Sequence, residues 1–219
     1  MPATDQEIIE LFGQDKTKEK GFNLLVEKYK QDIYFNIRRL VFSHEDANDI
    51  SQNVLIKIWK HLDQYRGEAG LKTWIIKICV NESLTFLERK KKMLNIIDEE
   101  GYNDYVTKTV AEDRFLSGDK IQHLLQEAIQ RLPEKQRAVF TLRYYEEMPY
   151  EEMAKIFGGS EGGLKASYHF AVKKVEEFLK LSIEERAKIL SELAGADGIF
   201  YPAQFEFDGT VNKQIILTC

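Results

Sequence analysis

The spacing of apolar residues over residues 46–60 constrains the fold of this chain more than any other feature. Ala47, Ile50, Val54 and Ile58 lie three or four positions apart, so in a helix they form one stripe that faces a core. The opposite face is polar except for one isoleucine: Asp46, Asp49, Gln52, Asn53, Ile56 and Lys60. This face is either an ordinary solvated surface or a surface that docks on another protein.

The same periodicity runs through the preceding residues, from Ile8 to Leu40, and Thr4 or Asp5 is expected to cap the first helix. Aromatic residues on these stripes are more often core than ligand contacts. A loop over residues 61–70 contains two glycines that allow tight turns before another helix begins. The sequence therefore predicts an all-helical first domain over residues 1–92.

The helix after this loop carries residues suited to nucleic acid. Thr73, Lys77 and Asn81 share one face, Trp74 lies beside them, and four basic residues, 89–92, end the helix. Basic residues there also favour the helix dipole, so a purely structural role stays open. An aromatic ring, an amide and a basic cluster are what single-stranded nucleic acid needs. Residues 57–92 hold nine basic and four acidic side chains, a net of +5 in a chain of net charge -5, which favours nucleic acid.

The second half of the chain divides into a linker and another helical domain. Residues 93–119 hold seven acidic and two basic side chains and several helix breakers, which is typical of a linker. Residues 120–181 are predicted to form the second domain. Within it, residues 150–157, a Gly-Gly turn and a helix capped by Ser160 have the dimensions of a helix-turn-helix. A helical hairpin that binds no DNA is the alternative.

On this second helix Leu164 and Val172 are expected to face the core, and Tyr168 and Phe170 are ambiguous. The candidates for a DNA groove or its phosphates are Lys165, Ser167, His169 and Lys173.

Residues 182–219 form a C-terminal extension. Ser182 and Glu185 have the spacing of a capping box, which predicts a short helix to about Leu193. Apolar segments on both sides of Asp208-Gly209 predict a small β-hairpin. The hairpin needs a surface to pack on, either the second domain or a dedicated partner. The expected fold class is all-α: two helical domains joined by an acidic linker, the second with a helix-turn-helix, plus this extension.

Several function classes are disfavoured. Two cysteines, Cys79 and Cys219, and four scattered histidines give neither a disulfide framework nor metal-ligand spacing. The sequence contains no apolar run long enough for a membrane span and no recognisable catalytic constellation. We therefore expect a cytoplasmic protein that is not an enzyme, with no cofactor, no metal and no membrane insertion.

Two groups of residues carry a family resemblance. The first is Asp46, Asp49-Ile50, Gln52, Trp59, Tyr65-Arg66-Gly67, Thr73-Trp74, Lys77-Ile78 and Asn81. It closely resembles the core domain of extracytoplasmic-function (ECF) sigma factors of bacterial RNA polymerase, in the sigma-70 superfamily. The second is Leu132-Pro133, Gln136-Arg137, Glu152, Ala154 and residues 162–165, and it resembles the domain of the same family that reads the minus-thirty-five element.

The resemblance implies a protein that binds core RNA polymerase, directs it to specific promoters and assists promoter opening. It implies polymerase docking by the polar face of residues 46–60 named above. It implies minus-ten DNA contacts by Tyr65, Arg66, Thr73, Trp74, Lys77, Asn81, Arg89, Lys90 and Lys91. It implies minus-thirty-five contacts by Arg137, Ser160, Lys165, Ser167, His169 and Lys173.

The C-terminal extension is the expected site for any partner other than polymerase and promoter DNA. An anti-sigma factor or another dedicated protein would bind the C-terminal extension. The alternative functions are a helix-turn-helix regulator that acts without polymerase and an adaptor whose helices bind only proteins.

Overall fold

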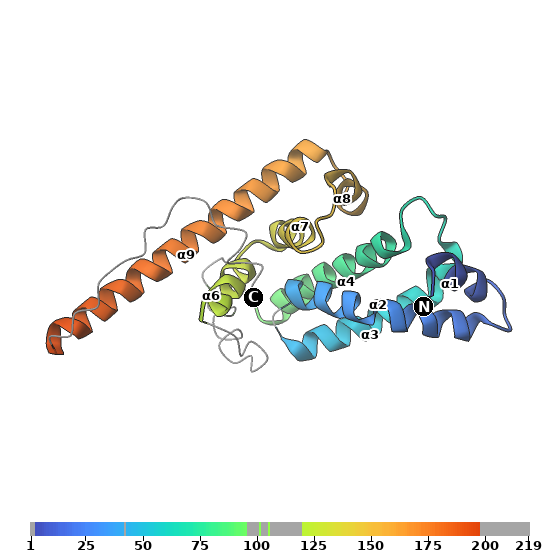
Figure 1. Cartoon of the computed structure of the whole chain (residues 1–219), viewed down its shortest axis with the longest axis horizontal. Coiled ribbons are helices and arrows are strands. Elements are labelled where there is room, and N and C mark those ends of the chain that lie inside the picture. Colours follow the sequence, from blue (N-terminus) through green and yellow to red (C-terminus); the bar gives the residue numbers. More distant parts are fainter. Residues whose placement is uncertain (1–2, 42, 96–100, 102–104, 106–119, 198–219) are drawn as a thin grey trace.

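The computed structural model describes residues 3–41, 43–95, 101, 105 and 120–197, and Figure 1 shows their arrangement. The elements in chain order are α1 Asp5–Phe12, α2 Lys18–Leu40, α3 His44–His61, the short 3₁₀ helix η1 Leu62–Gln64, α4 Leu71–Met93, α6 Lys120–Gln130, α7 Glu134–Tyr144, α8 Tyr150–Phe157 and α9 Glu161–Asp197. The described residues contain helices and no strand, which confirms the all-helical class for this part of the chain. The predicted hairpin lies outside the described residues.

Helices α1 to α4 form the first bundle. The predicted stripe on α3 is buried throughout, since Ala47, Ile50, Val54 and Ile58 are at most 2% exposed. Thr4 caps α1 as expected, because its side chain accepts a hydrogen bond from the Glu7 amide at 3.2 Å. Gly21 lets α2 approach α1 closely, since a Cβ there would lie 2.6 Å from the backbone nitrogen of Phe12.

Helices α6 to α9 form the second bundle, with α7 packed on α9. The turn between α8 and α9 needs its two glycines, because Gly158 and Gly159 have φ values of 69° and 107°. Ser160 then caps α9 by accepting a hydrogen bond from the Gly163 amide at 3.2 Å. Helices α8 and α9 therefore form the helix-turn-helix that the sequence predicts.

The prediction of a separate helix starting at Ser182 is wrong, because α9 continues without a break from Glu161 to Asp197. The residues before Ser182 are mostly strong helix formers, and the chain has no glycine or proline between Gly163 and Gly195. A capping box starts a helix only where the preceding chain is not helical. Here the helix has already formed, and extending it is easier than nucleating a new one.

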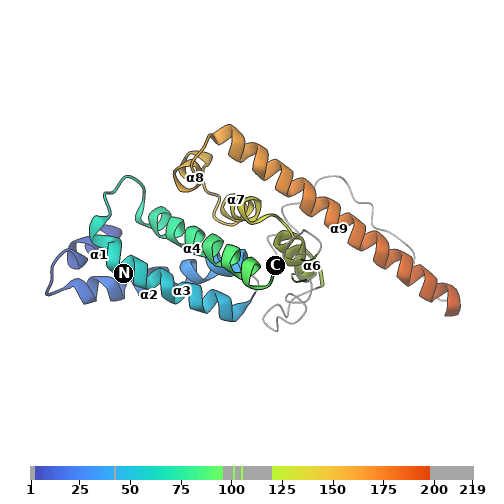
Figure 2. The same cartoon turned by 180° about the vertical axis from the view of Figure 1, so that it is seen from behind.

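The two bundles pack directly on each other along an interdomain seam, which we define as the contact of α7 and α8 with α2 and α4. Leu40, Ile76 and Val80 from the first bundle share one buried apolar cluster with residues of the second, among them Val139 and Met153. Figures 1 and 2 show α7 lying alongside α4 from both sides. Burial of this cluster stabilises the compact arrangement.

Within the residues placed by the structure, helices are too short or too polar to cross a membrane.

Candidate functional site

The outer face of α3 carries five of the six residues predicted to dock on a protein. Asp49, Gln52, Asn53 and Lys60 are exposed, and Ile56 is 51% exposed among them. The structure brings these five together on one side of the helix, opposite its buried stripe. An apolar side chain ringed by polar ones on a rigid helix is suited to protein contact.

Asp46, the sixth residue, is partly buried and accepts a hydrogen bond from the Lys90 ammonium group of α4. Burial, the largest influence, disfavours the lysine cation, but hydrogen bonds to Asp46 and Tyr105 raise the pKa of Lys90. The ammonium group therefore stays charged. Asp46 was predicted to contact polymerase and Lys90 to contact minus-ten DNA. In the structure they pair with each other and link α3 to α4.

A small hollow of about 50 Å³ between α3 and α4 also brings two predicted surfaces together. Asn53 from the docking face and Arg89 from the basic end of α4 both line it. The polymerase candidates and the basic cluster are thus adjacent on the first bundle.

The loop before α4 holds an aromatic pair. The Tyr65 and Trp74 rings meet edge to face with centroids 5.7 Å apart, and both side chains are partly buried. The Tyr65 hydroxyl donates to the Ala69 carbonyl across the loop, which turns at Gly67 with a φ of 73°. Burial raises the pKa of Tyr65, so its hydroxyl stays protonated and can donate. Arg66, the residue after Tyr65, is exposed.

The remaining minus-ten candidates divide into exposed and engaged residues. Lys77, Asn81 and Arg89 are exposed on α4. Thr73 instead donates a hydrogen bond of 2.8 Å to the Glu152 carboxylate of α8, and Lys91 forms an ion pair with Glu134 at the start of α7. The interdomain seam therefore occupies part of the surface predicted to read the minus-ten element.

Glu146, which follows α7, is the main polar contact of the seam, and the sequence did not single it out. Its carboxylate, 10% exposed, accepts hydrogen bonds from Asn36 at 3.2 Å and Arg39 at 3.3 Å. It also lies 2.9 Å from the Lys72 ammonium group. Lys72 has its pKa raised because these carboxylate contacts outweigh burial, the largest single influence, which lowers it. A carboxylate with three partners on α2 and α4 fixes the second bundle against the first.

The outer face of α9 carries most of the minus-thirty-five candidates. Ser160, Lys165, His169 and Lys173 are exposed, and Ser167 is partly buried. The structure also separates the two aromatics that the sequence left ambiguous. Tyr168 stacks on Phe140 with centroids 5.8 Å apart, whereas Phe170 is 57% exposed.

Arg137, which was predicted as a minus-thirty-five contact, does not lie on this face. It is fully buried, and its guanidinium donates to the Gln130 backbone carbonyl at 2.7 Å and side-chain oxygen at 3.0 Å. Gln130 in turn donates to the Arg39 and Val41 carbonyls at the end of α2. In this structure Arg137 orders the join between α6, α7 and α2, because a buried guanidinium is stable only when it is hydrogen-bonded.

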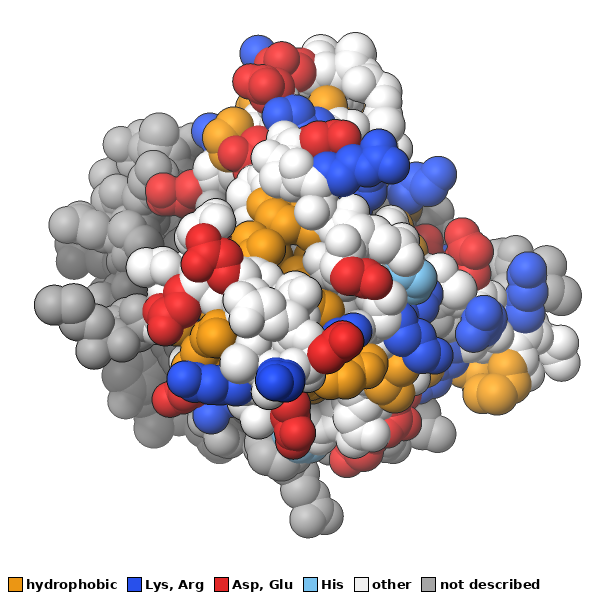
Figure 3. Space-filling view, turned by 90° about the vertical axis from the view of Figure 1, so that its right-hand side faces the viewer, with side chains coloured by type: hydrophobic (Ala, Val, Ile, Leu, Met, Phe, Trp, Pro, Cys, Tyr) orange, Lys and Arg blue, Asp and Glu red, His pale blue; other side chains and the backbone are white. Residues whose placement is uncertain are grey.

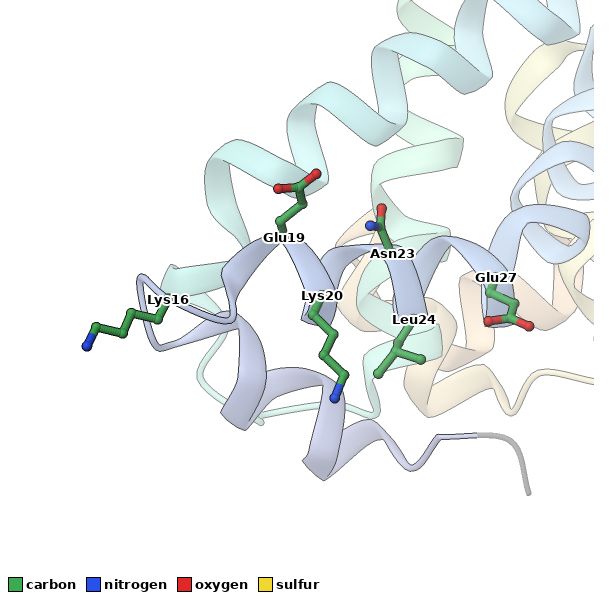
Figure 4. A pocket seen from close by; sticks show the side chains of 6 residues that line it. All are labelled: Lys16, Glu19, Lys20, Asn23, Leu24 and Glu27. Atoms are coloured by element: carbon green, nitrogen blue, oxygen red, sulfur yellow. The ribbon is translucent and has the colours of Figure 1, made fainter.

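A hollow at the start of α2 is lined by none of the predicted site residues. Figure 4 shows a shallow hollow of about 390 Å³ lined by Lys16 and by residues of α2, with side chains of both charges. These side chains point in different directions and do not converge on a common point. Seen from the end where α1 lies, the surface mixes acidic and basic side chains with small hydrophobic areas between them (Figure 3).

Two family models match the chain in the regions just described. Residues 25–93 match the model "Sigma-70 region 2", which spans α3, the loop and α4. Residues 122–175 match "Sigma-70, region 4", which includes the helix-turn-helix.

The chain is also similar to curated sigma factors, and the similarity extends over most of the length of each relative. The RNA polymerase sigma-H factor of Pseudomonas aeruginosa is 27% identical over 188 residues, covering 83% of this chain and 96% of the relative. The ECF RNA polymerase sigma-E factor of Haemophilus influenzae is 29% identical over 181 residues, covering 79% and 94%.

Solved structures share the fold. The sigma factor RpoE in complex with the anti-sigma factor NepR from Bartonella quintana has a TM-score of 0.57 and 21% identity, covering 74% of this chain and 98% of that one. CnrH in complex with the cytosolic domain of CnrY has a TM-score of 0.56 and 15% identity, covering 81% and 97%.

The chain belongs to the sigma-70 family and is a sigma factor of the ECF type. Sigma factors are non-enzymatic initiation factors that bind core RNA polymerase and direct it to promoters. Family membership decides against the two alternatives, a polymerase-independent regulator and a protein-only adaptor.

Proposed function

We propose that three separate faces of this sigma factor carry polymerase docking, minus-ten melting and minus-thirty-five recognition. The observation that carries the proposal is the outer face of α3, where Ile56 is half exposed among polar side chains beside the basic end of α4. A polymerase docked there would hold the minus-ten DNA near Trp74 and Asn81. The corresponding domains are residues 1–92 and 120–181, joined by residues 93–119.

The docking face can be tested by charge. Asp49→Lys combined with Ile56→Arg places two cations on it and leaves the buried stripe intact, so the fold should survive. We expect association with core polymerase to be lost in a pull-down while circular dichroism stays unchanged. Glu27→Lys, the same charge reversal at an exposed position on α2, should bind normally. Full co-purification of the double variant would contradict the assignment.

The minus-ten face supplies what captured bases need. Trp74 offers a partly exposed ring, Asn81 an exposed amide, and Lys77 and Arg89 exposed positive charge. Unpairing and capturing a base costs a few kcal/mol, which stacking and hydrogen bonds of about 1 to 3 kcal/mol each can offset. The residues that seam contacts occupy, Thr73 and Lys91, would join them only once those contacts break.

Binding to both promoter elements at once requires the two bundles to separate, because the elements lie far apart on the DNA. The minus-ten and minus-thirty-five elements lie about 25 base pairs apart, or about 85 Å along B-DNA. In the compact structure the two bundles are in contact beside the minus-ten surface, since Thr73 of α4 lies 2.8 Å from Glu152 of α8. A duplex much shorter than its persistence length of about 150 base pairs does not bend sharply enough to bring both elements there. We infer that the compact form is the form off the promoter.

The C-terminal extension remains a proposed site for a dedicated protein. Support for such a partner comes from a structural neighbour, the sigma factor RpoE, which was solved in complex with the anti-sigma factor NepR. Removing residues 198–219 tests this and keeps the described span of α9. The truncated chain should still bind polymerase but lose capture of an anti-sigma protein from its own cells; unchanged capture would place that partner elsewhere.

A further inference from the structure

The outer face of α9 contains one exposed aromatic side chain, Phe170. The proposed DNA contacts of the polar residues on this face do not explain it. Gly162, Ala166 and Phe170 follow one another at intervals of four, so they lie on one side of the helix. Leu164, Ala171 and Val175 are buried on the other side. Phe170 is 57% exposed, and this leaves a large apolar ring in water.

Neither the core nor the interdomain seam accounts for Phe170. Its neighbours Ala171 and Tyr168 belong to buried apolar clusters, and Phe170 belongs to none of those in the described residues. Its described ring contact is with His169, at 6.3 Å between centroids. Phe170 therefore adds little to the stability of the folded chain.

The charges around Phe170 match DNA. From Gly162 to Val175 the helix carries three lysines, one histidine and no acidic residue. Lys165, five residues before Phe170, and Lys173, three residues after it, are both exposed. A positively charged helix face with one apolar residue near its middle is complementary to a major groove, where phosphates line the edges and bases the floor.

We propose that Phe170, with Ala166 one turn before it, reads thymine in the minus-thirty-five duplex by packing against the C5-methyl group. This rests on the proposed function of α9 and names the base that it recognises. The thymine methyl is the apolar group that the major groove presents, and apolar side chains such as Ala and Phe contact it. The small residues Gly162 and Ala166 let the helix approach the base edges, where the longer Phe170 side chain reaches the floor.

The experiment uses the full chain bound to core polymerase. Duplexes are first selected from a library randomised over the minus-thirty-five region. In the selected sequence each thymine is then replaced, one at a time, by deoxyuridine, which lacks only the methyl group. Affinity is measured by fluorescence anisotropy at fixed salt. We expect about a fourfold loss at one or two positions, the effect of exposing one methyl-sized group.

The variant Phe170→Ala tests whether Phe170 is the residue that contacts the thymine methyl group. This variant should bind the selected duplex about tenfold more weakly, as for the loss of one base contact. It should also lose its sensitivity to deoxyuridine at the position that the wild-type chain reads. Phe35→Ala, the same truncation at another exposed phenylalanine on α2, should keep both affinity and sensitivity.

Other results would overturn the inference. If Phe170→Ala keeps the deoxyuridine effect, another residue contacts the methyl group. If it weakens binding to polymerase and leaves duplex affinity unchanged, Phe170 is a protein contact. If the wild-type complex selects a sequence without thymine dependence, only this inference fails. If it selects no sequence, the proposed role of α9 fails with it.

Discussion

The two promoter-directed surfaces differ in how the compact structure treats them. On α4, Thr73 is bonded to Glu152 and Lys91 is paired with Glu134, so part of the predicted melting surface is occupied by the second bundle. On α9 the outer face is exposed from Ser160 to Lys173. The same packing thus restrains the surface that we propose opens DNA and leaves accessible the surface that we propose reads duplex. This difference predicts that the compact form can bind an isolated minus-thirty-five duplex, whereas contact with both promoter elements and melting require the bundles to separate.

Reversing the charge of Glu146 should remove this difference. Glu146→Lys would place an ammonium group beside Arg39 and Lys72, in a site that is nearly buried. Losing a hydrogen bond to a charged group costs about 1.5 to 3 kcal/mol, and here the cost falls on the compact form. We expect the bundles to separate, measured as an increase in distance between fluorophores placed on α1 and α8. Affinity for a minus-thirty-five duplex should change little.

The matched control for this change is Glu151→Lys. Glu151 is exposed and pairs with Lys155 within α8, so its reversal leaves the seam intact. Equal separation in both variants would mean that the effect comes from net charge, and the specific contacts of Glu146 would then be unimportant.

Asn81→Ala should affect the melting surface alone. The amide is exposed on α4, so its loss leaves the fold and the closed promoter complex intact. Losing one contact to an unpaired base costs about 1 to 3 kcal/mol, and promoter opening should fall accordingly in a permanganate footprint. On a template already unpaired at the minus-ten element the defect should shrink. An equal defect on both templates would rule out a role in melting.

Thr73→Val tests the contact between the two surfaces with a smaller change. Valine keeps the shape of threonine but cannot donate to Glu152, so the compact form loses one hydrogen bond of about 0.5 to 1.5 kcal/mol. The interdomain distance measured as above should shift slightly toward the separated form. Thr85→Val, at an exposed position on α4, is the control and should leave the distance unchanged.

Acidification should weaken the seam through Glu134. Burial, the largest influence, raises the pKa of this carboxyl, but the hydrogen bond and charge of Lys91, its own backbone amide and the charge of Arg137 together hold its pKa below the ordinary 4.5. A lowered folded-state pKa stabilises the folded form above the ordinary value, and this contribution is lost as pH falls through the folded pKa.

Glu134→Gln should therefore flatten the lower part of the stability profile measured by thermal melting from about pH 7 to about pH 3. The same change at the exposed Glu151 provides the comparison. A profile for Glu134→Gln that overlays the wild-type profile would show that this pair does not hold the seam.

The sequence predicted the features that depend on local pattern. The stripe on α3, the Thr4 and Ser160 caps and the Gly-Gly turn follow from helical spacing and from residues with special backbone needs. They can be read locally because each involves residues within a few positions of one another. The exposure of the α3 outer face follows from the same periodicity.

Features that depend on contacts between distant residues were missed. Arg137 was expected to contact DNA because the family resemblance implied it, but its burial depends on Gln130 and on the end of α2, which the local sequence does not reveal. Glu146 is one acid among many until folding places Asn36, Arg39 and Lys72 around it. The helical phase relative to Leu164 and Ala171 could have indicated the exposure of Phe170.

The length of α9 gives the second bundle a mechanical property. A helix of 37 residues is about 55 Å long. Its first turns carry the face that we propose reads DNA, while its far end projects away from both bundles (Figure 1). A rigid rod of this kind acts as a lever. If the second bundle rotates by about 15°, as subunits do in known transitions, the far end moves by about 14 Å. A ligand bound near Asp197 would act on the seam through this long arm. A weak force at that end would therefore oppose a larger force that rotates the second bundle near the seam.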